Sequence, residues 1–318
     1  TAPVTLVRGG RTGKTIIVTV GDGIAVPGLS SNVVVSINPA TGSMSVLDHA
    51  VGDVNRDGKT DVIYTTSAGE LIVLTNSATA GALVAGDLNL GTNMTSLSGS
   101  LKAVEAGDVD LDGIVDLLVL DYAGNRFSVF QNGTTNPSAA VEFTNQVNVG
   151  IAPGGTGPED LLFVDVDGDG KRDVITANRT TANLSVFLNT SVAGSISFAA
   201  ATNIALPSAP VQLEAADLDG DGRSDILIGL GLAPNNTVGL LRNISTAGTF
   251  GYDPLAELAA GANQAFRRIV TGDLNGDSKT DILYSDSASI LSFINQSTNG
   301  VLVAASFAAG TDISQGIS

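Results

Sequence analysis

The sequence has no Cys and no Trp, and other aromatic residues are rare. Its 318 residues include 4 Tyr and 10 Phe. Without Cys the chain can form neither disulfides nor thiolate metal sites. Because 43% of the residues are hydrophobic, a core is still expected, built mainly from Val, Ile, Leu and Ala. No run of 18 apolar residues occurs, so no membrane-spanning helix is predicted.

Positive charge is scarce as well. The chain has 15 Lys and Arg against 32 Asp and Glu, which gives a net charge of −17. Nucleic-acid binding requires a basic surface patch, so neither DNA nor RNA is an expected partner. The 38 Gly residues, together with abundant Ser, Thr and Asn, predict many short strands joined by tight turns.

The acidic residues are concentrated in a nine-residue pattern, Asp-x-Asp/Asn-x-Asp-Gly/Ser-x-x-Asp, that occurs five times. The five copies, named loops A to E, hold 18 of the 26 Asp residues. They are DVNRDGKTD from Asp53, DVDLDGIVD from Asp108, DVDGDGKRD from Asp165, DLDGDGRSD from Asp217 and DLNGDSKTD from Asp273. Their spacing of 55, 57, 52 and 56 residues indicates a structural repeat.

The sequence around each loop repeats in phase with it. A short apolar stretch precedes each loop, a β-branched stretch follows, and a third apolar stretch ends at an Asn, here called the repeat Asn. A fourth stretch often opens with Phe, as in 143–149, 198–204 and 307–313. The repeat Asn residues are Asn76, Asn132, Asn189, Asn243 and Asn295. Four short strands per unit is typical of a β-propeller blade, so five blades are predicted over residues 45–318.

Residues 1–44 have the features of a degenerate blade. The run 7–15 corresponds to a metal loop that is two residues shorter and has no acidic ligands. The run 16–20 then matches a second strand and 32–38 a third. We therefore expect an all-β propeller that forms a single domain over 1–318. Six blades are the first choice, five with metal loops, and seven remain the alternative.

The spacing also predicts that this first blade lacks its outer strand. Only 15 residues separate Asn38 from Asp53, against 28 to 33 in the other blades. An open strand edge around 33–37 could accept a strand from a neighbouring subunit or from another part of a larger protein, which would give a polymer or adhesive array. Strand addition between copies of this chain would give a homopolymer. The alternative is a three-stranded blade capped by residues 21–31.

Each loop has the ligands that Ca²⁺ requires. Calcium takes six to eight oxygen ligands, and alternate side chains at positions 1, 3 and 5 converge when the chain curls around one point. Position 9 closes the shell and position 7 offers a backbone carbonyl. A sharp turn with positive φ is expected at position 6, which is Gly in four loops and Ser278 in the fifth.

The predicted ligands follow from this scheme, with about five Ca²⁺ for the chain. The side-chain ligands are Asp53, Asn55, Asp57, Asp61, Asp108, Asp110, Asp112, Asp116, Asp165, Asp167, Asp169, Asp173, Asp217, Asp219, Asp221, Asp225, Asp273, Asn275, Asp277 and Asp281. The carbonyl ligands are those of Lys59, Ile114, Lys171, Arg223 and Lys279. Mg²⁺ fits less well because it demands strict octahedral geometry.

An EF-hand begins with a similar pattern, but it is excluded. It requires a bidentate acidic residue at position 12 and helices on both sides. Position 12 is Tyr64, Val119, Thr176, Ile228 or Tyr284, and the flanking sequence is β-rich.

The loops and the repeat Asn together resemble the FG-GAP/VCBS repeat family over roughly residues 44–313. Gly248-Thr249-Phe250 also resembles the Gly-x-Phe entry of that repeat, although Phe-Gly itself is clear only at Phe250-Gly251. The resemblance implies a calcium-loop propeller like the integrin α-subunit head, with the metal loop between the first and second strands of a blade. It does not determine function, because this fold serves many functions.

Three functions are weighed. The first is a calcium-stabilised scaffold or adhesion module, secreted or on the cell surface, that binds a protein or surface partner. The second is a glycan-binding propeller, for which Tyr122 and Tyr252 are the available platforms, since Tyr64 and Tyr284 occupy equivalent strand positions that indicate packing. The third and least favoured is a polysaccharide-degrading enzyme; no catalytic residues are assigned.

Eight Asn-x-Ser/Thr sequons could accept a glycan. They are Asn93, Asn132, Asn178, Asn183, Asn189, Asn235, Asn243 and Asn295. Four of them are repeat Asn residues, for which a turn-forming role is the alternative explanation.

Overall fold

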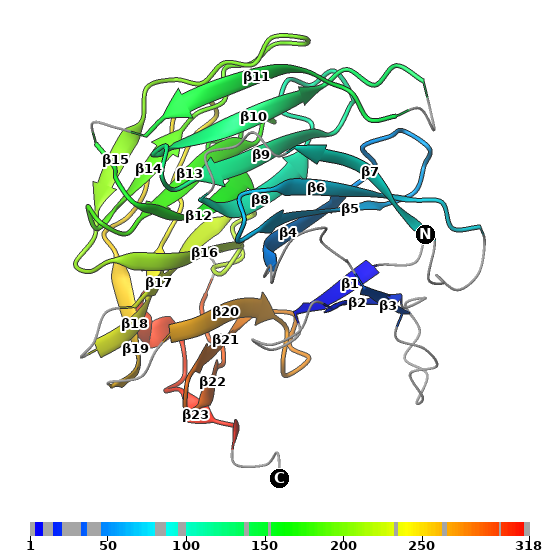
Figure 1. Cartoon of the computed structure of the whole chain (residues 1–318). Coiled ribbons are helices and arrows are strands. Elements are labelled where there is room, and N and C mark those ends of the chain that lie inside the picture. Colours follow the sequence, from blue (N-terminus) through cyan, green and yellow to red (C-terminus); the bar gives the residue numbers. More distant parts are fainter. Residues whose placement is uncertain are drawn as a thin grey trace. The chain divides into compact units, whose positions relative to one another are not determined.

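The computed structural model describes residues 4–8, 15–20, 33–36, 46–79, 87–94, 100–136, 140–151, 154–231, 235–262, 266–298 and 300–314. The chain divides into two compact units, Thr1–Val149 and Gly150–Ser318. Each unit consists of antiparallel sheets in which consecutive strands are neighbours (Figure 1). In the described residues, no helix is long and apolar enough to cross a membrane.

The first unit holds three sheets. The first has the order β1-β2-β3, from β1 (Val4–Arg8), β2 (Thr15–Val20) and β3 (Val33–Ser36). The second is formed by β4 (Val46–Gly52), β5 (Asp61–Thr66), β6 (Leu71–Asn76) and β7 (Leu88–Met94). The third contains β8 (Leu101–Gly107), β9 (Asp116–Asp121), β10 (Arg126–Asn132) and β11 (Phe143–Gly150).

The second unit holds three sheets of four strands. The first contains β12 (Pro158–Val164), β13 (Asp173–Asn178), β14 (Asn183–Phe187) and β15 (Thr202–Ala205). The next contains β16 (Pro210–Ala216), β17 (Asp225–Leu230), β18 (Asn235–Leu241) and β19 (Ala256–Ala262). The last is formed by β20 (Phe266–Gly272), β21 (Asp281–Asp286), β22 (Ile290–Phe293) and β23 (Thr311–Asp312), with a short 3₁₀ turn at Ala304–Ser306.

The all-β class and the four-stranded repeat are confirmed by these sheets. The expected fourth strand at 143–149 is β11. At 198–204 and 307–313 the strand begins later: Phe198 and Phe307 form only isolated bridges, to Asn189 and Asn295, before β15 and β23 start. The expected strands at 16–20 and 32–38 correspond to β2 and β3. Residues 21–31, the proposed cap, lie outside the described residues.

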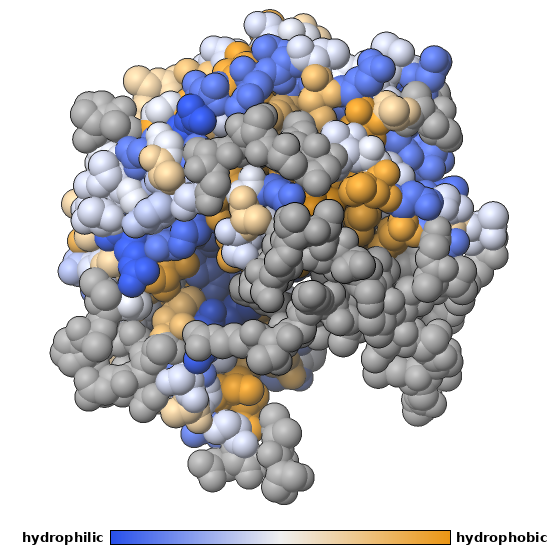
Figure 2. Space-filling model, viewed as in Figure 1, coloured by the Kyte–Doolittle hydropathy of each residue, from blue (hydrophilic) through white to orange (hydrophobic). Residues whose placement is uncertain are grey.

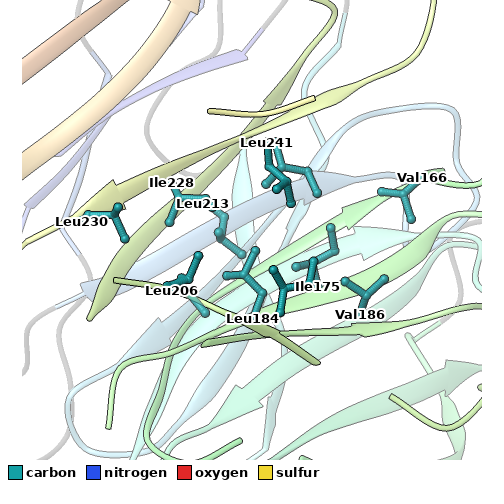
Figure 3. Close-up of a cluster of buried hydrophobic side chains, with 12 residues drawn as sticks. Val166, Ile175, Leu184, Val186, Leu206, Leu213, Ile228, Leu230 and Leu241 are labelled. Carbon is teal, nitrogen blue, oxygen red and sulfur yellow. The ribbon is translucent and has the colours of Figure 1, made fainter. Parts of the chain in front are cut away.

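The hydrophobic core lies between neighbouring sheets and is mainly aliphatic. In the second unit Ile175, Leu184 and Val186 from β13 and β14 lie in one buried cluster with Leu213 and Ile228 from β16 and β17 (Figure 3). The second strands β5, β9, β13 and β17 are buried along their whole length. Strands buried on both faces have continuous apolar sequences, which is why the stretches after loops A to D are rich in apolar residues.

The first strand of each four-stranded sheet carries an irregularity in register against the second. Near this position, side chains reach the backbone of the next sheet within the same unit. Asp48 accepts from the Val104 N–H (3.0 Å), Asp160 accepts from the Leu213 N–H (2.7 Å), and Gln212 accepts from the Ile269 N–H (2.7 Å) and donates to its carbonyl (2.9 Å). A bulge re-aims a side chain in this way, and each contact ties two sheets together.

The edge strand β11 is polar on its outer face. Asn145, Gln146 and Asn148 are exposed, whereas Val147 and Val149 are half-buried. Figure 2 shows both hydrophilic and apolar residues in this region. Polar side chains on an edge strand discourage unwanted strand pairing.

Candidate metal centres

Loops A to E all occupy the same place in the fold. Each follows the first strand of a four-stranded sheet directly, and position 9 is the first residue of the second strand. Loop A, for example, runs from the end of β4 at Gly52 to Asp61, where β5 begins. This is the location that the family resemblance implies.

The backbone of each loop turns sharply at two positions. Position 6 has positive φ in every loop, with 81°, 83°, 89° and 87° at Gly58, Gly113, Gly170 and Gly222 and 66° at Ser278. The expectation of positive φ at position 6 is therefore confirmed.

Position 4 has the same left-handed conformation, which sequence reasoning missed. Arg56 and Leu111 have φ of 60° and 61°, and the glycines Gly168, Gly220 and Gly276 have φ of 70°, 74° and 83°. Three glycines at one loop position were the available signal, but Arg and Leu in the other two loops concealed it.

The carboxylate at position 1 holds this turn in place. In loop C, Asp165 accepts hydrogen bonds from the backbone N–H of Gly168 (2.7 Å) and Gly170 (3.0 Å). Asp273 in loop E accepts in the same way from Gly276 and Ser278, and these bonds, with Ser278 the largest cause, lower its pKa. Position 1 therefore organises the loop as well as offering oxygen atoms to a cation.

Positions 1, 3 and 9 converge in loops B, C and D. In each of these loops, three carboxylate oxygens, one from each position, lie within 4.8 Å of one another. The groups are Asp108, Asp110 and Asp116; Asp165, Asp167 and Asp173; and Asp217, Asp219 and Asp225. In loops A and E position 3 is Asn55 or Asn275, so the corresponding group has one acidic residue fewer.

Position 5 lies beside these groups and caps the turn. Its carboxylate accepts from the N–H of position 7 in every loop, as in Asp169 with Lys171 (2.8 Å) and Asp277 with Lys279 (2.9 Å). This hydrogen bond fixes the peptide at position 7. The carbonyl ligands proposed at that position stay predictions.

The Asp at position 9 is a buried clamp. In loop B, Asp116 is 0% exposed, and its two oxygens accept from the N–H of Val109 (3.0 Å) and of the repeat Asn132 (2.8 Å). The other four loops repeat both hydrogen bonds, with Asp61, Asp173, Asp225 and Asp281 as acceptors. The same carboxylate thus fixes the start of its loop and the end of the third strand.

The repeat Asn extends this clamp to the neighbouring sheet. The Nδ2 of Asn132 donates to the carbonyl of Val54 in loop A (2.8 Å), and Asn243 bonds in the same way to Val166 in loop C (2.9 Å). Asn295 reaches Leu218 in loop D (2.7 Å). Each of these loops is therefore fastened to the following sheet, so its conformation affects the contact between sheets.

Burial raises the pKa of the position 9 carboxyls in four loops. The pKa rises to about 7 for Asp116 and Asp173 and to about 6 for Asp61 and Asp225, because desolvation outweighs the two backbone hydrogen bonds. Neighbouring loop carboxylates add to the effect. Holding several ionised carboxylates this close is therefore unfavourable unless a cation balances them.

These groups fit a hard divalent cation. All the potential metal ligands are oxygen atoms, and at least three of them converge in each of loops B to D. The backbone of each loop also forms a sharp turn. The residue types suit Ca²⁺ better than Zn²⁺, which prefers nitrogen and sulfur ligands. The three triads can thus bind metal ions.

A protein-family model describing the FG-GAP-like repeat matches residues 108–176 and 165–228. The chain contains FG-GAP-like repeats. Each matched segment runs from one Asp-rich loop through the next, so together they cover loops B, C and D, the same loops that form the carboxylate triads. No curated protein matches the sequence.

Solved structures share the fold of these FG-GAP-like repeats at low sequence identity. A protein from Lactobacillus plantarum has a TM-score of 0.60 at 12% identity, over 96% of this chain and 81% of its own. A lectin from Agrocybe aegerita, which recognises non-reducing terminal N-acetylglucosamine, has a TM-score of 0.56 at 18% identity, over 98% and 79%. A protein of unknown function from Desulfotomaculum acetoxidans has a TM-score of 0.55 at 14% identity, over 94% and 82%. The structural neighbours are β-propellers, and at this identity they show the fold alone.

Six of the eight sequon Asn side chains are engaged in hydrogen bonds within the fold. They are buried, and each Nδ2 donates to a neighbouring group: Asn132, Asn178, Asn183, Asn189, Asn243 and Asn295. A glycan on Nδ2 is incompatible with these contacts in the folded chain, so a turn-forming and clamping role explains them. The side chains of Asn93 and Asn235 lie outside the described residues.

Proposed function

We propose that this chain is a calcium-stabilised, six-bladed propeller that acts outside the cell as a non-catalytic scaffold or adhesion module. The observation that carries the proposal is the connection from loop to clamp to neighbouring sheet. Asp116 and Asn132 tie loop B to its own third strand and to loop A. A cation in such a loop therefore stabilises the contact between sheets, and millimolar extracellular Ca²⁺ suits loops of this kind.

Calcium removal tests this proposal. Ca²⁺ at 100 times its Kd adds about 2.7 kcal/mol per site to the stability of the folded state, so the midpoint of thermal unfolding should fall by many degrees in excess EDTA. Native mass spectrometry should count up to five bound ions, and Mg²⁺ at equal concentration should restore less of the loss. Equal midpoints in Ca²⁺ and EDTA would rule out a structural role for calcium.

A glycan-binding propeller is the second candidate, because two aromatic side chains are available at the surface. Tyr122 and Tyr252 are each 38% exposed, whereas Tyr64 and Tyr284 are buried, as expected for packing residues. Tyr252 stacks on Phe250 with ring centroids 5.5 Å apart, and Lys102 lies over Tyr122. A calcium-dependent hit on a glycan array that Tyr122→Ala or Tyr252→Ala abolishes would favour this function over a protein partner.

Assembly through the first sheet belongs to the same proposal. In the described residues β3 pairs with β2 and is the last strand in its sheet. An unpaired edge offers N–H and C=O groups to a strand from a second copy or another part of a longer protein. Light scattering over a wide concentration range would test self-association, and Val34→Pro should abolish it, since Pro removes a backbone donor. A monomer at every concentration would contradict this part of the proposal.

A further inference from the structure

Loop D differs from the other loops in having two guanidinium groups on its carboxylates. The Nε of Arg242 lies 2.5 Å from Oδ2 of Asp219, and its Nη2 lies 3.3 Å from Oδ2 of Asp221. Arg223, at position 7 of the loop, contacts the same oxygen of Asp221. A third carboxylate, that of Asp253, accepts from Nη1 of Arg242 (3.1 Å).

The residue before the repeat Asn is placed to contact position 3 of the loop. Arg242 precedes Asn243, and the equivalent residue in loop B's repeat is Gln131, whose Nε2 donates to Oδ2 of Asp110 (2.7 Å). The equivalent residues in the remaining repeats are Thr75, Leu188 and Ile294, none of which carries a charge. The residue before the repeat Asn therefore places a neutral hydrogen-bond donor on loop B and a cationic side chain on loop D.

The Arg242 contact is well shielded from water. The Arg242 side chain is 16% exposed, and those of Asp219 and Asp221 are 0% and 12% exposed. Ion pairs in such surroundings are weakly screened by salt. The planar guanidinium also matches carboxylate oxygens in geometry. Arg242 is thus held in one arrangement by three carboxylates.

We propose that Arg242 is a built-in counter-cation for loop D, which keeps this loop folded at calcium concentrations too low for loops B and C and weakens its own affinity for Ca²⁺. The proposal rests on calcium binding by the loops. One oxygen of Asp219 and one of Asp221 already accept hydrogen bonds from Arg242, and its positive charge repels a divalent cation in the same loop. The loops would then become ordered at different calcium concentrations, and the conformation of loop D would depend least on calcium.

The decisive experiment exchanges the two equivalent side chains in the full chain. The variants are Arg242→Gln and Gln131→Arg, with Arg242→Lys as the control that keeps a positive charge. Hydrogen–deuterium exchange of peptides that contain 108–116, 165–173 and 217–225 is measured in EDTA and across a Ca²⁺ titration. Native mass spectrometry counts the bound ions.

In the wild-type chain, 217–225 should be protected in EDTA while 108–116 and 165–173 gain protection only with Ca²⁺. Arg242→Gln should make protection of 217–225 calcium-dependent and raise the calcium affinity of one site at least about tenfold, the scale expected for removing a nearby like charge. Gln131→Arg should weaken loop B's response, and Arg242→Lys should stay near wild type.

Two results would overturn the proposal: 217–225 exchanging as fast as 108–116 in EDTA, or Arg242→Gln leaving its calcium dependence unchanged. If Arg242→Gln does not fold, an unchanged calcium response of 108–116 in Gln131→Arg is the result that counts against it. If none of the three peptides gains protection from Ca²⁺, calcium binding itself fails, which is a separate outcome.

Discussion

Loops B and D have the same backbone turn but balance their carboxylates differently. In both, the N–H of position 6 donates to the position 1 carboxylate, from Gly113 at 2.8 Å and from Gly222 at 2.9 Å. Loop D adds Arg223 and Arg242 to its four Asp residues. Loop B instead has Ile114 at position 7 and the neutral Gln131 beside Asp110, and Arg56 of loop A acts on its Asp112. The backbone shape of the loop is therefore the same in both copies, whereas its dependence on a cation differs from one copy to the other.

In both loops, burial and neighbouring carboxylates raise the pKa of the position 9 carboxyl. Burial and, to a smaller extent, Asp110 and Asp112 raise the pKa of Asp116 in loop B to about 7, against about 6 for Asp225 in loop D. Burial and the neighbouring Asp110 and Asp108 carboxylates also raise the pKa of Asp112. The carboxylates of loop B thus raise one another's pKa, a cost that a bound cation would relieve.

The largest expected effect should be equal in the two loops. Asp116→Ala and Asp225→Ala each leave two buried backbone N–H groups without an acceptor, those of Val109 and Asn132 in loop B and their counterparts in loop D. At about 1–3 kcal/mol per orphaned group, each change should lower the free energy of unfolding by roughly 2–5 kcal/mol.

Urea unfolding in saturating Ca²⁺, in which both loops are expected to be folded, measures this loss, and the lost calcium ligand adds to it in both variants. Glu142→Gln, an exposed acidic residue outside the loops, is the matched control and should have almost no effect. Clearly unequal losses in Asp116→Ala and Asp225→Ala would show that the clamp is not shared between repeats.

Removing the position 3 charge should change the stability of the calcium-free protein differently in loops D and B. Asp219→Asn removes the main partner of Arg242, and breaking such a shielded pair costs about 3 kcal/mol. Asp110→Asn instead removes a charge that raises the pKa of both Asp112 and Asp116, so it should leave the calcium-free protein unchanged or slightly more stable.

The amide of Gln131 can rotate to pair with the amide that Asp110→Asn introduces, and Asn occurs naturally at position 3 in loops A and E, so the substitution fits sterically. With saturating Ca²⁺ both variants should be less stable than the wild-type chain. Equal destabilisation of both variants in EDTA would contradict the charge difference between the loops.

The pH dependence of stability should follow from the raised pKa values. An unfolded Asp titrates near pH 4, whereas Asp116 and Asp173 titrate at about 7 in the folded chain. The folded state therefore binds more protons between these values, so their contribution is fully present below about pH 4 and is lost as the pH rises through about 7. In EDTA the thermal midpoint should thus rise by several degrees when the pH is lowered from 8 to 5.

Calcium should reverse this trend, because a bound cation favours the ionised carboxylates and protons compete with it. The difference between the midpoints in Ca²⁺ and in EDTA should therefore widen from pH 5 to pH 8. Asp225 titrates with a pKa of about 6, so the exchange protection of 217–225 should also change within this pH range. A gap that is constant across this range would contradict the assignment.

Much of this organisation follows from local sequence. The loop boundaries, the turn at position 6 and the burial of Tyr64 and Tyr284 depend on residues close together in the chain or on the strand period. The contact between sheets and the Arg242 contact do not: Asn132 and Val54 are 78 residues apart, and Arg242 lies 23 residues from Asp219. No local pattern announces such partners, so the clamp between sheets and the counter-cation of loop D required the structure.

The smallest expected effect concerns backbone strain in loop E, and it separates strain from charge as a cause of differences between loops. Ser278 has φ of 66° at the position where the other loops have Gly, a conformation that costs a residue with a Cβ about 1–2 kcal/mol. Ser278→Gly keeps the backbone N–H that donates to Asp273 (2.9 Å) and should stabilise the chain by about 0.5–1 kcal/mol after the entropy cost of Gly. Gly113→Ala is the mirror-image control: its added methyl would meet no atom within 4 Å, so it should destabilise loop B through φ alone, by about 1 kcal/mol. For each substitution, the change in the free energy of unfolding should be the same in Ca²⁺ as in EDTA. A calcium-dependent effect of Ser278→Gly would show that backbone strain, like charge, contributes to the loop's response to the ion.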